Sequence, residues 1–128
     1  IMINVGIIGV SGYTGLELVK LILNHPKFNL NYIATSKGEG DLVSLHPALK
    51  NVFNIDVSSV DFNQIKQKCE LVFLALPHKS AMEVAKELIE LNIKVVDLSA
   101  DYRLEQQTYE EAYCKHIDSK NLKYAAYG

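Results

Sequence analysis

The sequence predicts an α/β domain built on a doubly wound, mostly parallel sheet, and three observations support this prediction. Strand-like apolar runs alternate with helix-like segments along the 128-residue chain. Several of these runs are continuously apolar, notably residues 71–76, which is typical of strands buried on both faces of a parallel sheet. A glycine-rich turn follows the first run and leads directly into a helical pattern. We therefore expect one sheet with helices on both sides.

The expected strands are short apolar runs that are bounded by polar or turn-forming residues. We place them at residues 3–8, 30–35, 52–57, 71–76, 94–98 and 123–127. The expected helices lie between these strands. We place them over residues 16–23, 62–68, 82–91 and 109–115.

Start and stop signals define the ends of these helices. A capping box, in which Ser or Thr precedes Glu by three residues, is expected at Ser80 and at Thr108. Asp61 is expected to cap the helix over residues 62–68. The first helix is expected to end at Asn24-His25-Pro26, because proline and the residue before it both disfavour helical geometry.

The glycine turn at residues 9–15 has the spacing Gly-x-x-Gly-x-x-Gly, which differs by one residue from the common Gly-x-Gly-x-x-Gly fingerprint. We expect Gly9 to allow the tight exit from the strand and Gly12 to let the backbone approach a phosphate. Gly15 shares a helical face with apolar residues and should let the helix lie close to the sheet. Free N–H groups and the helix dipole converge here, so a dinucleotide pyrophosphate fits. The alternative is a glycine-rich turn that binds no ligand.

Hydroxyl groups within the turn supply further hydrogen-bonding capacity. Ser11, Tyr13 and Thr14 each offer a hydroxyl as well as a backbone N–H. Thr14 together with Glu17 also fits a capping box. The hydroxyl of Thr14 is therefore a helix cap, a ligand contact, or both.

The end of the second strand bears on which dinucleotide is bound. An NAD site usually places an acid there to bind the ribose 2′-hydroxyl. This chain has Ser36 and Lys37 instead, and a hydroxyl and a cation suit a 2′-phosphate, which an acid would repel. We therefore favour NADP. Glu39 and Asp41 lie nearby and keep NAD open, and Lys37 can also be read as a solvated residue of a flexible glycine loop.

The ends of the fourth and fifth strands supply more candidates, because ligands in such folds bind outside the carboxyl ends of the strands. We expect Leu76 and Pro77 to form an apolar wall against a cofactor ring, with His78 at the mouth of the site. A loop histidine without a ligand is the alternative for His78. Residues 97–103 are dense in polar side chains, and Arg103 either holds an anionic substrate or pairs with a nearby carboxylate such as Asp101.

Composition argues against several classes of function. A net charge of −2 gives no basic surface for nucleic acid or for an acidic membrane. No apolar run approaches the roughly 20 residues of a membrane span, and no secretory leader is recognisable. Cys69 and Cys114 suggest neither a disulfide framework nor a metal site, and neither has a base that would make it a nucleophile. We therefore expect a cytoplasmic protein with no metal.

Three segments resemble the N-acetyl-gamma-glutamyl-phosphate reductases of arginine biosynthesis. They are GVSGYTGLEL at residues 9–18, LALPH at residues 74–78 and VDLSADYRL at residues 96–104. The final Ala-Tyr-Gly matches the start of a further family motif that continues Leu-Pro-Glu. The first segment also fits the related aspartate-semialdehyde dehydrogenases, but the tyrosine after Gly12 and the run Ser-Ala-Asp-Tyr-Arg point to the reductase.

The resemblance implies a Rossmann-type domain over residues 1–128 that binds NADP, within an enzyme acting on a small acyl phosphate. In that family, a cysteine attacks the acyl phosphate of N-acetylglutamate, and hydride from NADPH then reduces the thioester to N-acetylglutamate 5-semialdehyde. The match places the cofactor phosphates on the glycine turn and the 2′-phosphate on the loop after the second strand. The residues implied at the cofactor site are Gly9, Ser11, Gly12, Tyr13, Thr14, Gly15, Ser36, Lys37, Leu76, Pro77, His78 and Ser99.

The chain also departs from the family. The nucleophilic cysteine of the family lies in an Asn-Pro-Gly-Cys-like motif downstream of the point that matches Gly128, and neither cysteine of this chain lies in such a motif. We therefore expect a fragment that binds cofactor but holds no catalytic residue, from a parent that forms a homo-oligomer. The alternatives are an aspartate-semialdehyde dehydrogenase-like NADP domain and a free-standing nucleotide-sensing module.

Overall fold

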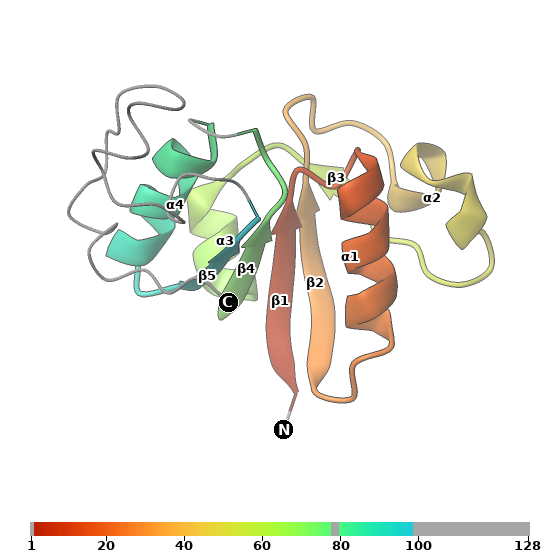
Figure 1. The fold of residues 1–128 in the computed structure, drawn as a ribbon, viewed down its shortest axis with the longest axis horizontal. Helices are drawn as coiled ribbons and strands as arrows, with labels where there is room; N and C mark the ends of the chain where they lie inside the picture. The colour runs from red at the N-terminus through yellow and green to blue at the C-terminus, as the bar shows by residue number, and fades with distance from the viewer. Residues whose placement is uncertain (1, 78–79, 99–128) are drawn as a thin grey trace.

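All strand neighbours in the sheet run parallel. The computed structural model describes residues 2–77 and 80–98, and within them five strands form one sheet in the order β3-β2-β1-β4-β5 (Figure 1). The strands are β1 (Ile3–Ile8), β2 (Phe28–Ala34), β3 (Val57–Ser58), β4 (Leu71–Leu74) and β5 (Lys94–Asp97). This order and direction confirm the predicted doubly wound parallel sheet.

Helices cover both faces of this sheet, because the chain winds outward from β1 in two directions (Figure 1). The helices are α1 (Tyr13–Leu23), α2 (Leu42–Leu45), the 3₁₀ turn η1 (Pro47–Leu49), α3 (Phe62–Lys68) and α4 (Ser80–Glu90). On one face, α1 and the α2–η1 segment share an apolar core with the sheet. On the other face, α3 and α4 form a second core. None of the helices that the structure describes is long and apolar enough to cross a membrane.

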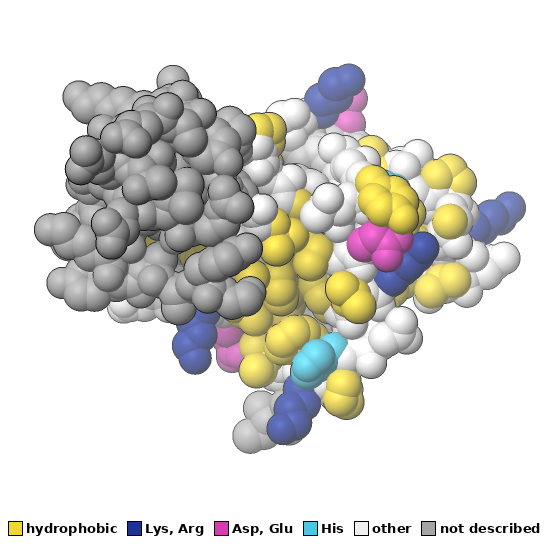
Figure 2. Space-filling view, viewed as in Figure 1, with side chains coloured by type: hydrophobic (Ala, Val, Ile, Leu, Met, Phe, Trp, Pro, Cys, Tyr) yellow, Lys and Arg dark blue, Asp and Glu magenta, His cyan; other side chains and the backbone are white. Residues whose placement is uncertain are grey.

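The central strand β1 contributes to both cores. Val5 and Ile7 point into the core beneath α1, and Ile8 points into the core beneath α3 and α4. This arrangement explains why the strand reads as a continuous apolar run. On the α1 face of the sheet, β4 is covered less completely than β1, because Leu71 and Phe73 are only partly buried. Figure 2 shows apolar side chains reaching the surface beside α1.

Several element predictions are confirmed. The first strand has the predicted bounds, and α3 has the predicted bounds and the predicted cap, with Asp61 accepting from the N–H groups of Asn63 and Gln64 at 3.0 and 3.2 Å. Helix α1 ends at Leu23 with Asn24 as its C-cap, as expected. The strand predicted at residues 123–127 and the helix predicted at 109–115 with its cap Thr108 lie outside the described residues.

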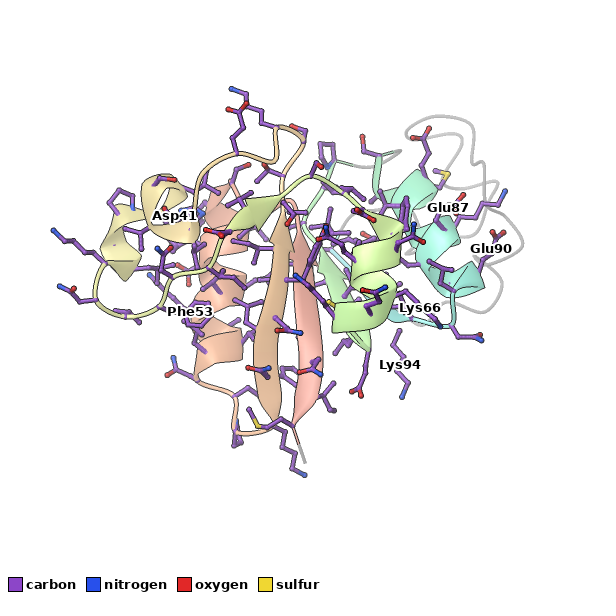
Figure 3. All side chains as sticks on the ribbon, turned by 180° about the vertical axis from the view of Figure 1, so that it is seen from behind. Asp41, Phe53, Lys66, Glu87, Glu90 and Lys94 are labelled. Carbon is purple, nitrogen blue, oxygen red and sulfur yellow. The ribbon has the colours of Figure 1, made fainter. Side chains whose placement is uncertain are left out.

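Other element predictions need correction. Helix α4 already includes Ser80, so Ser80 is not the residue that precedes the helix. The strand predicted at residues 52–57 is wrong, since only Val57 and Ser58 pair with the sheet. Phe53 and Ile55 are apolar because they pack onto the α1-side core from a loop, and Figure 3 shows Phe53 on that loop beside α2. The α2–η1 segment was not predicted.

Candidate cofactor-binding site

The carboxyl ends of β1 and β4 lie next to each other at the point where the winding of the sheet reverses. The chain leaves β1 for α1 on one face and leaves β4 for α4 on the other face (Figure 1). Folds of this kind bind ligands in the crevice at such a switch point. The N–H of Gly9 donates to Ala34 O on one side (2.9 Å), and the N–H of Ala75 donates to Ile8 O on the other (2.9 Å). The glycine turn therefore begins between the ends of β2 and β4.

Gly9 is required by both conformation and packing. Its φ of +92° lies in the left-handed region, which side chains rarely adopt. A Cβ at this position would lie 2.4 Å from the backbone oxygen of Ala75 and 3.0 Å from a methyl carbon of Leu76. The structure thus confirms that Gly9 allows the tight exit from β1, and it brings the predicted wall residue Leu76 against the turn.

Gly15 is required by packing, although its closest neighbour is not the sheet. Helix α1 buries Gly15, Leu18, Val19 and Ile22, which is the face expected from the sequence. A Cβ on Gly15 would lie 2.4 Å from the backbone oxygen of Val10. The expected close approach to the sheet is therefore an approach of the helix to the turn that precedes it.

Gly12 has no such internal reason to be a glycine. Its φ of −84° and ψ of 178° are ordinary extended geometry, and a Cβ built there would meet nothing within 4 Å. Gly12 is exposed and is the N-cap residue of α1. The space in front of it is open, which is what the close approach of a ligand to the backbone would need.

The N-terminus of α1 carries backbone donors without acceptors. No side chain caps this helix, and its first internal hydrogen bond runs from Leu16 N to Gly12 O at 3.1 Å. The N–H groups of Tyr13, Thr14 and Gly15 therefore have no acceptor within the described part of the chain. Such donors at the positive end of a helix dipole favour an anion, and here they lie at the switch point.

The hydroxyl residues of the turn are all exposed, as a ligand contact requires. Ser11 and Thr14 are exposed, and Tyr13 leaves 78% of its surface open. The capping box predicted for Thr14 and Glu17 is wrong, because Gly12 occupies the N-cap position and Thr14 lies two residues further along. Glu17 instead lies 3.5 Å from the Lys20 ammonium.

The loop after β2 is held by one hydrogen bond to the end of β3 and by another within the loop itself. The N–H of Thr35 donates to Ser58 O (3.0 Å), and the Thr35 hydroxyl accepts from the N–H of Gly38 (3.0 Å). Gly38 has a φ of +66°, and a Cβ there would lie 2.4 Å from Ser59 N. Between these anchors, Ser36 and Lys37 are exposed, and their side chains bond to no other described residue.

Tyr32 holds the segment after β3 against which Gly38 of this loop packs. Its hydroxyl donates to Ser59 O (2.7 Å) and accepts from the N–H of Asp61 (3.2 Å). Burial raises the pKa of the Tyr32 hydroxyl above its usual value, so it stays a protonated donor. Sequence reasoning missed both Tyr32 and Thr35 as supports, because the partners of Tyr32 lie 27 and 29 positions away and the N–H of Thr35 donates to Ser58 on β3.

Asp41 is one of the two acids that left NAD as an alternative cofactor, but its side chain caps a helix instead. It is the N-cap of α2, as Figure 3 indicates by its place at the start of that helix. The side-chain amide of Asn54 (3.0 Å) and the N–H of Ser44 (2.8 Å) both donate to its carboxylate and hold its pKa below the usual value. This carboxylate therefore caps a helix, whereas Glu39 is exposed.

His46 contacts the glycine turn and was also missed. It is buried, with 8% of its surface exposed, and its ring Nε2 lies 2.6 Å from Val10 O. No periodicity or motif around His46 in the sequence indicates this contact, since the two residues are 36 positions apart.

The remaining predicted positions divide into described and undescribed ones. Pro77 is exposed at the end of β4, and its carbonyl accepts from Ala81 N at the start of α4 (3.1 Å). His78, Ser99, Asp101, Arg103 and Cys114 lie outside the described residues.

Burial raises the pKa of the Cys69 thiol to about 11, which agrees with a structural rather than a nucleophilic role. No cluster of potential metal ligands occurs in residues 2–77 and 80–98.

Comparison with known proteins gives a family and a fold. A family profile described as "Semialdehyde dehydrogenase, NAD binding domain" matches residues 4–123. The N-acetyl-gamma-glutamyl-phosphate reductase of Sulfurimonas denitrificans is 58% identical over 126 residues, which cover 98% of this chain and 38% of that protein. The enzyme of the same name from Methanosarcina barkeri is 46% identical over 126 residues, which cover 96% of this chain and 37% of that protein. These relatives confirm the resemblance seen in the three motifs, and the chain spans little more than a third of their length.

Solved structures that are similar in shape are more distant in sequence. Aspartate semialdehyde dehydrogenase from Candida albicans, solved with NADP, superimposes with a TM-score of 0.66 at 21% identity, over 83% of this chain and 32% of that one. A 3-ketoreductase from Actinomadura kijaniata, solved with NADP, gives a TM-score of 0.62 at 14% identity, over 88% and 34%. At these identities the likeness shows the Rossmann-type fold.

Proposed function

The chain belongs to the family of semialdehyde dehydrogenase NAD-binding domains, and from this premise we propose that it is the NADP-binding domain of an N-acetyl-gamma-glutamyl-phosphate reductase. The observation that carries the proposal is the open, uncapped N-terminus of α1 at the switch point. The proposed domain extends over residues 1–128.

The glycine turn supplies the proposed pyrophosphate site. The N–H groups of Tyr13, Thr14 and Gly15 have no acceptor in the described chain, and a phosphate provides the negative charge that the helix dipole favours. Gly12 supports close approach of the phosphate, because a Cβ there would occupy the open space. The exposed hydroxyls of the turn, on Ser11, Tyr13 and Thr14, supply the additional donors that we propose.

The loop after β2 supplies the proposed site for the adenosine ribose. Ser36 and Lys37 are exposed on a loop whose two ends are anchored, so their side chains can meet a 2′-phosphate without rearrangement of the backbone. The engagement of Asp41 as a helix cap supports NADP over NAD, because that acid does not compete for the ribose. Glu39 is the remaining acid of the loop.

Leu76 and Pro77 line the proposed cleft from the β4 side, and His78 and Ser99 complete it by the motif match alone. Leu76 is half-buried against Gly9, which places an apolar surface next to the turn. A bound NADPH would supply hydride for reducing the acyl group of the substrate. In the full-length protein this corresponds to the reduction of N-acetylglutamyl 5-phosphate to N-acetylglutamate 5-semialdehyde with release of phosphate. A cytoplasmic location and a homo-oligomeric parent stay predictions.

The test is an NADPH oxidation assay of the full-length protein with two acyl phosphates, N-acetylglutamyl 5-phosphate and aspartyl 4-phosphate. We expect rapid phosphate-releasing oxidation of NADPH with the first substrate and little with the second. A preference for aspartyl phosphate would assign the protein to the aspartate-semialdehyde dehydrogenases instead. If the protein turned over neither substrate and did not bind NADP, the better account would be a nucleotide-sensing module that binds another nucleotide.

A further inference from the structure

A buried histidine makes a hydrogen bond to the backbone of the glycine turn. The ring Nε2 of His46 lies 2.6 Å from the carbonyl oxygen of Val10, and the side chain is 8% exposed. A carbonyl oxygen only accepts, so Nε2 carries the hydrogen and donates it. The contact joins the segment after β2 to the turn after β1, across 36 positions of sequence.

The Val10 carbonyl is confined by neighbours on two sides. It faces Gly15 so closely that a Cβ there would lie 2.4 Å from it, so α1 limits it on one side. His46 holds it on another side, and the N–H of Val10 donates to Ala34 O at the end of β2 (3.3 Å). The next residues, Ser11 and Gly12, lead directly to the uncapped N-terminus of α1. The orientation of the Val10 peptide therefore helps to set where the free N–H groups point.

His46 is itself held firmly, as a positioning residue must be. Its own N–H donates to Leu42 O (2.8 Å), and its carbonyl accepts from Leu49 N (3.0 Å), so it connects α2 to η1. The start of α2 is fixed by the reciprocal capping box of Asp41 and Ser44. Leu42 and Leu49 anchor this segment in the core beneath α1.

A histidine in this place is not explained by packing alone. The site borders an apolar core, where a leucine side chain would bury more hydrocarbon, and a buried polar group is unfavourable unless it is hydrogen-bonded. What histidine adds is one donor aimed at the Val10 carbonyl.

We propose that His46 is a positioning residue for the cofactor, which holds the Val10 carbonyl and thereby keeps the glycine turn in the conformation that presents its N–H groups to a pyrophosphate. This inference rests on the proposed binding of a dinucleotide at the turn. It adds a specific role for the α2–η1 segment, which lies outside the turn itself.

The experiment compares His46→Leu, which fills the space without a donor, with His46→Gln, whose longer amide can reach the same carbonyl. Leu49→Val is the matched control, since Leu49 is buried in the same segment and supplies no side-chain donor to the turn. We expect His46→Leu to weaken NADP binding on the order of tenfold, as for loss of one hydrogen bond, and His46→Gln to recover most of it. Leu49→Val should bind NADP as the unchanged protein does. His46→Asn, whose shorter amide falls short of the carbonyl, repeats the comparison if His46→Leu does not fold.

A second readout separates this inference from the proposed function. Amide hydrogen exchange at Val10 and Leu16, whose N–H groups donate to Ala34 O and Gly12 O, reports the two ends of the turn in the ligand-free protein. We expect faster exchange there in His46→Leu than in Leu49→Val at matched stability, with His46→Gln restoring it. Failure of the unchanged protein to bind NADP would reject the proposed function alone. Unchanged exchange and unchanged affinity in folded His46→Leu, or losses in Leu49→Val as large as those in His46→Leu, would overturn the role of His46.

Discussion

The turn after β1 and the loop after β2 lie at the same edge of the sheet but are held in different ways. The turn after β1 is fixed by close backbone packing, with no room for a Cβ at Gly9 or Gly15, and it presents backbone N–H groups. The loop after β2 is fixed only at its ends, through Thr35 and Gly38, and it presents two exposed side chains between them.

This difference divides recognition into two parts. Backbone N–H groups at a helix N-terminus recognise a phosphate whatever dinucleotide carries it, provided that the glycines of the turn keep the backbone in place. The exposed side chains of Ser36 and Lys37 can change without altering the backbone that holds them, so we propose that this loop discriminates between NADP and NAD. The first region should therefore tolerate few substitutions, and the second should tolerate many.

The largest expected effect is on stability, from Gly9→Ala. The alanine must adopt a φ of +92°, and its methyl group would lie 2.4 Å from Ala75 O. Strain of this kind should lower the free energy of unfolding by about 3 kcal/mol. Urea unfolding measures it, with Gly12→Ala as the matched control, because its methyl group would meet nothing in the chain. Equal stability of the two variants would show that the turn is not tightly packed.

The next effect separates binding from stability. Gly12→Ala should lower the free energy of unfolding by no more than about 1 kcal/mol, because Gly12 is an exposed N-cap whose backbone geometry is ordinary. The methyl group would nevertheless stand in the space proposed for the pyrophosphate, so we expect NADP and NAD to bind at least roughly tenfold more weakly. Calorimetric titration of both cofactors measures this. Undiminished affinity for both would place the pyrophosphate elsewhere.

A smaller effect is expected from Tyr32→Phe, beneath the second loop. The change removes the donor to Ser59 O and the acceptor for Asp61 N, with little change in buried apolar area. The free energy of unfolding should fall by about 1 to 2 kcal/mol. Thermal unfolding measures it. Because the pyrophosphate turn does not depend on Tyr32, NAD affinity should hold in the folded variant, and a loss of NAD binding would mean that the two regions are coupled.

The parts of the fold that the sequence predicted correctly are those set by local patterns. The bounds of β1 and α3, the Asp61 cap and the buried face of α1 all follow from residues within a few positions of each other. The predicted strand at residues 52–57 failed because Phe53 and Ile55 are apolar for a tertiary reason, namely packing onto α1 and the sheet from a loop. The Thr14–Glu17 cap failed because Gly12 starts the helix earlier than the pattern indicates.

The candidate site shows the same division. The types of residue in the turn and at Ser36-Lys37 were readable in sequence, because their chemistry follows directly after a strand. Their supports were not readable. Gly15 meets Val10, Gly38 meets Ser59, and His46 meets Val10, and the last two contacts depend on how distant segments come together in the folded sheet. Asp41 caps α2 through Ser44, three positions along the chain, whereas the Asn54 amide that also bonds its carboxylate comes from a more distant segment.

The most direct test of the two-part account is the ratio of NADP to NAD affinity before and after Lys37→Glu. The account predicts that the unchanged protein binds NADP at least roughly tenfold more tightly than NAD. Lys37→Glu should abolish that preference by weakening NADP alone, with NAD affinity within about threefold and unfolding unchanged, since Lys37 is exposed and bonds to no other described residue. Equal affinity for both cofactors in the unchanged protein, or an equal loss of both in Lys37→Glu, would contradict it.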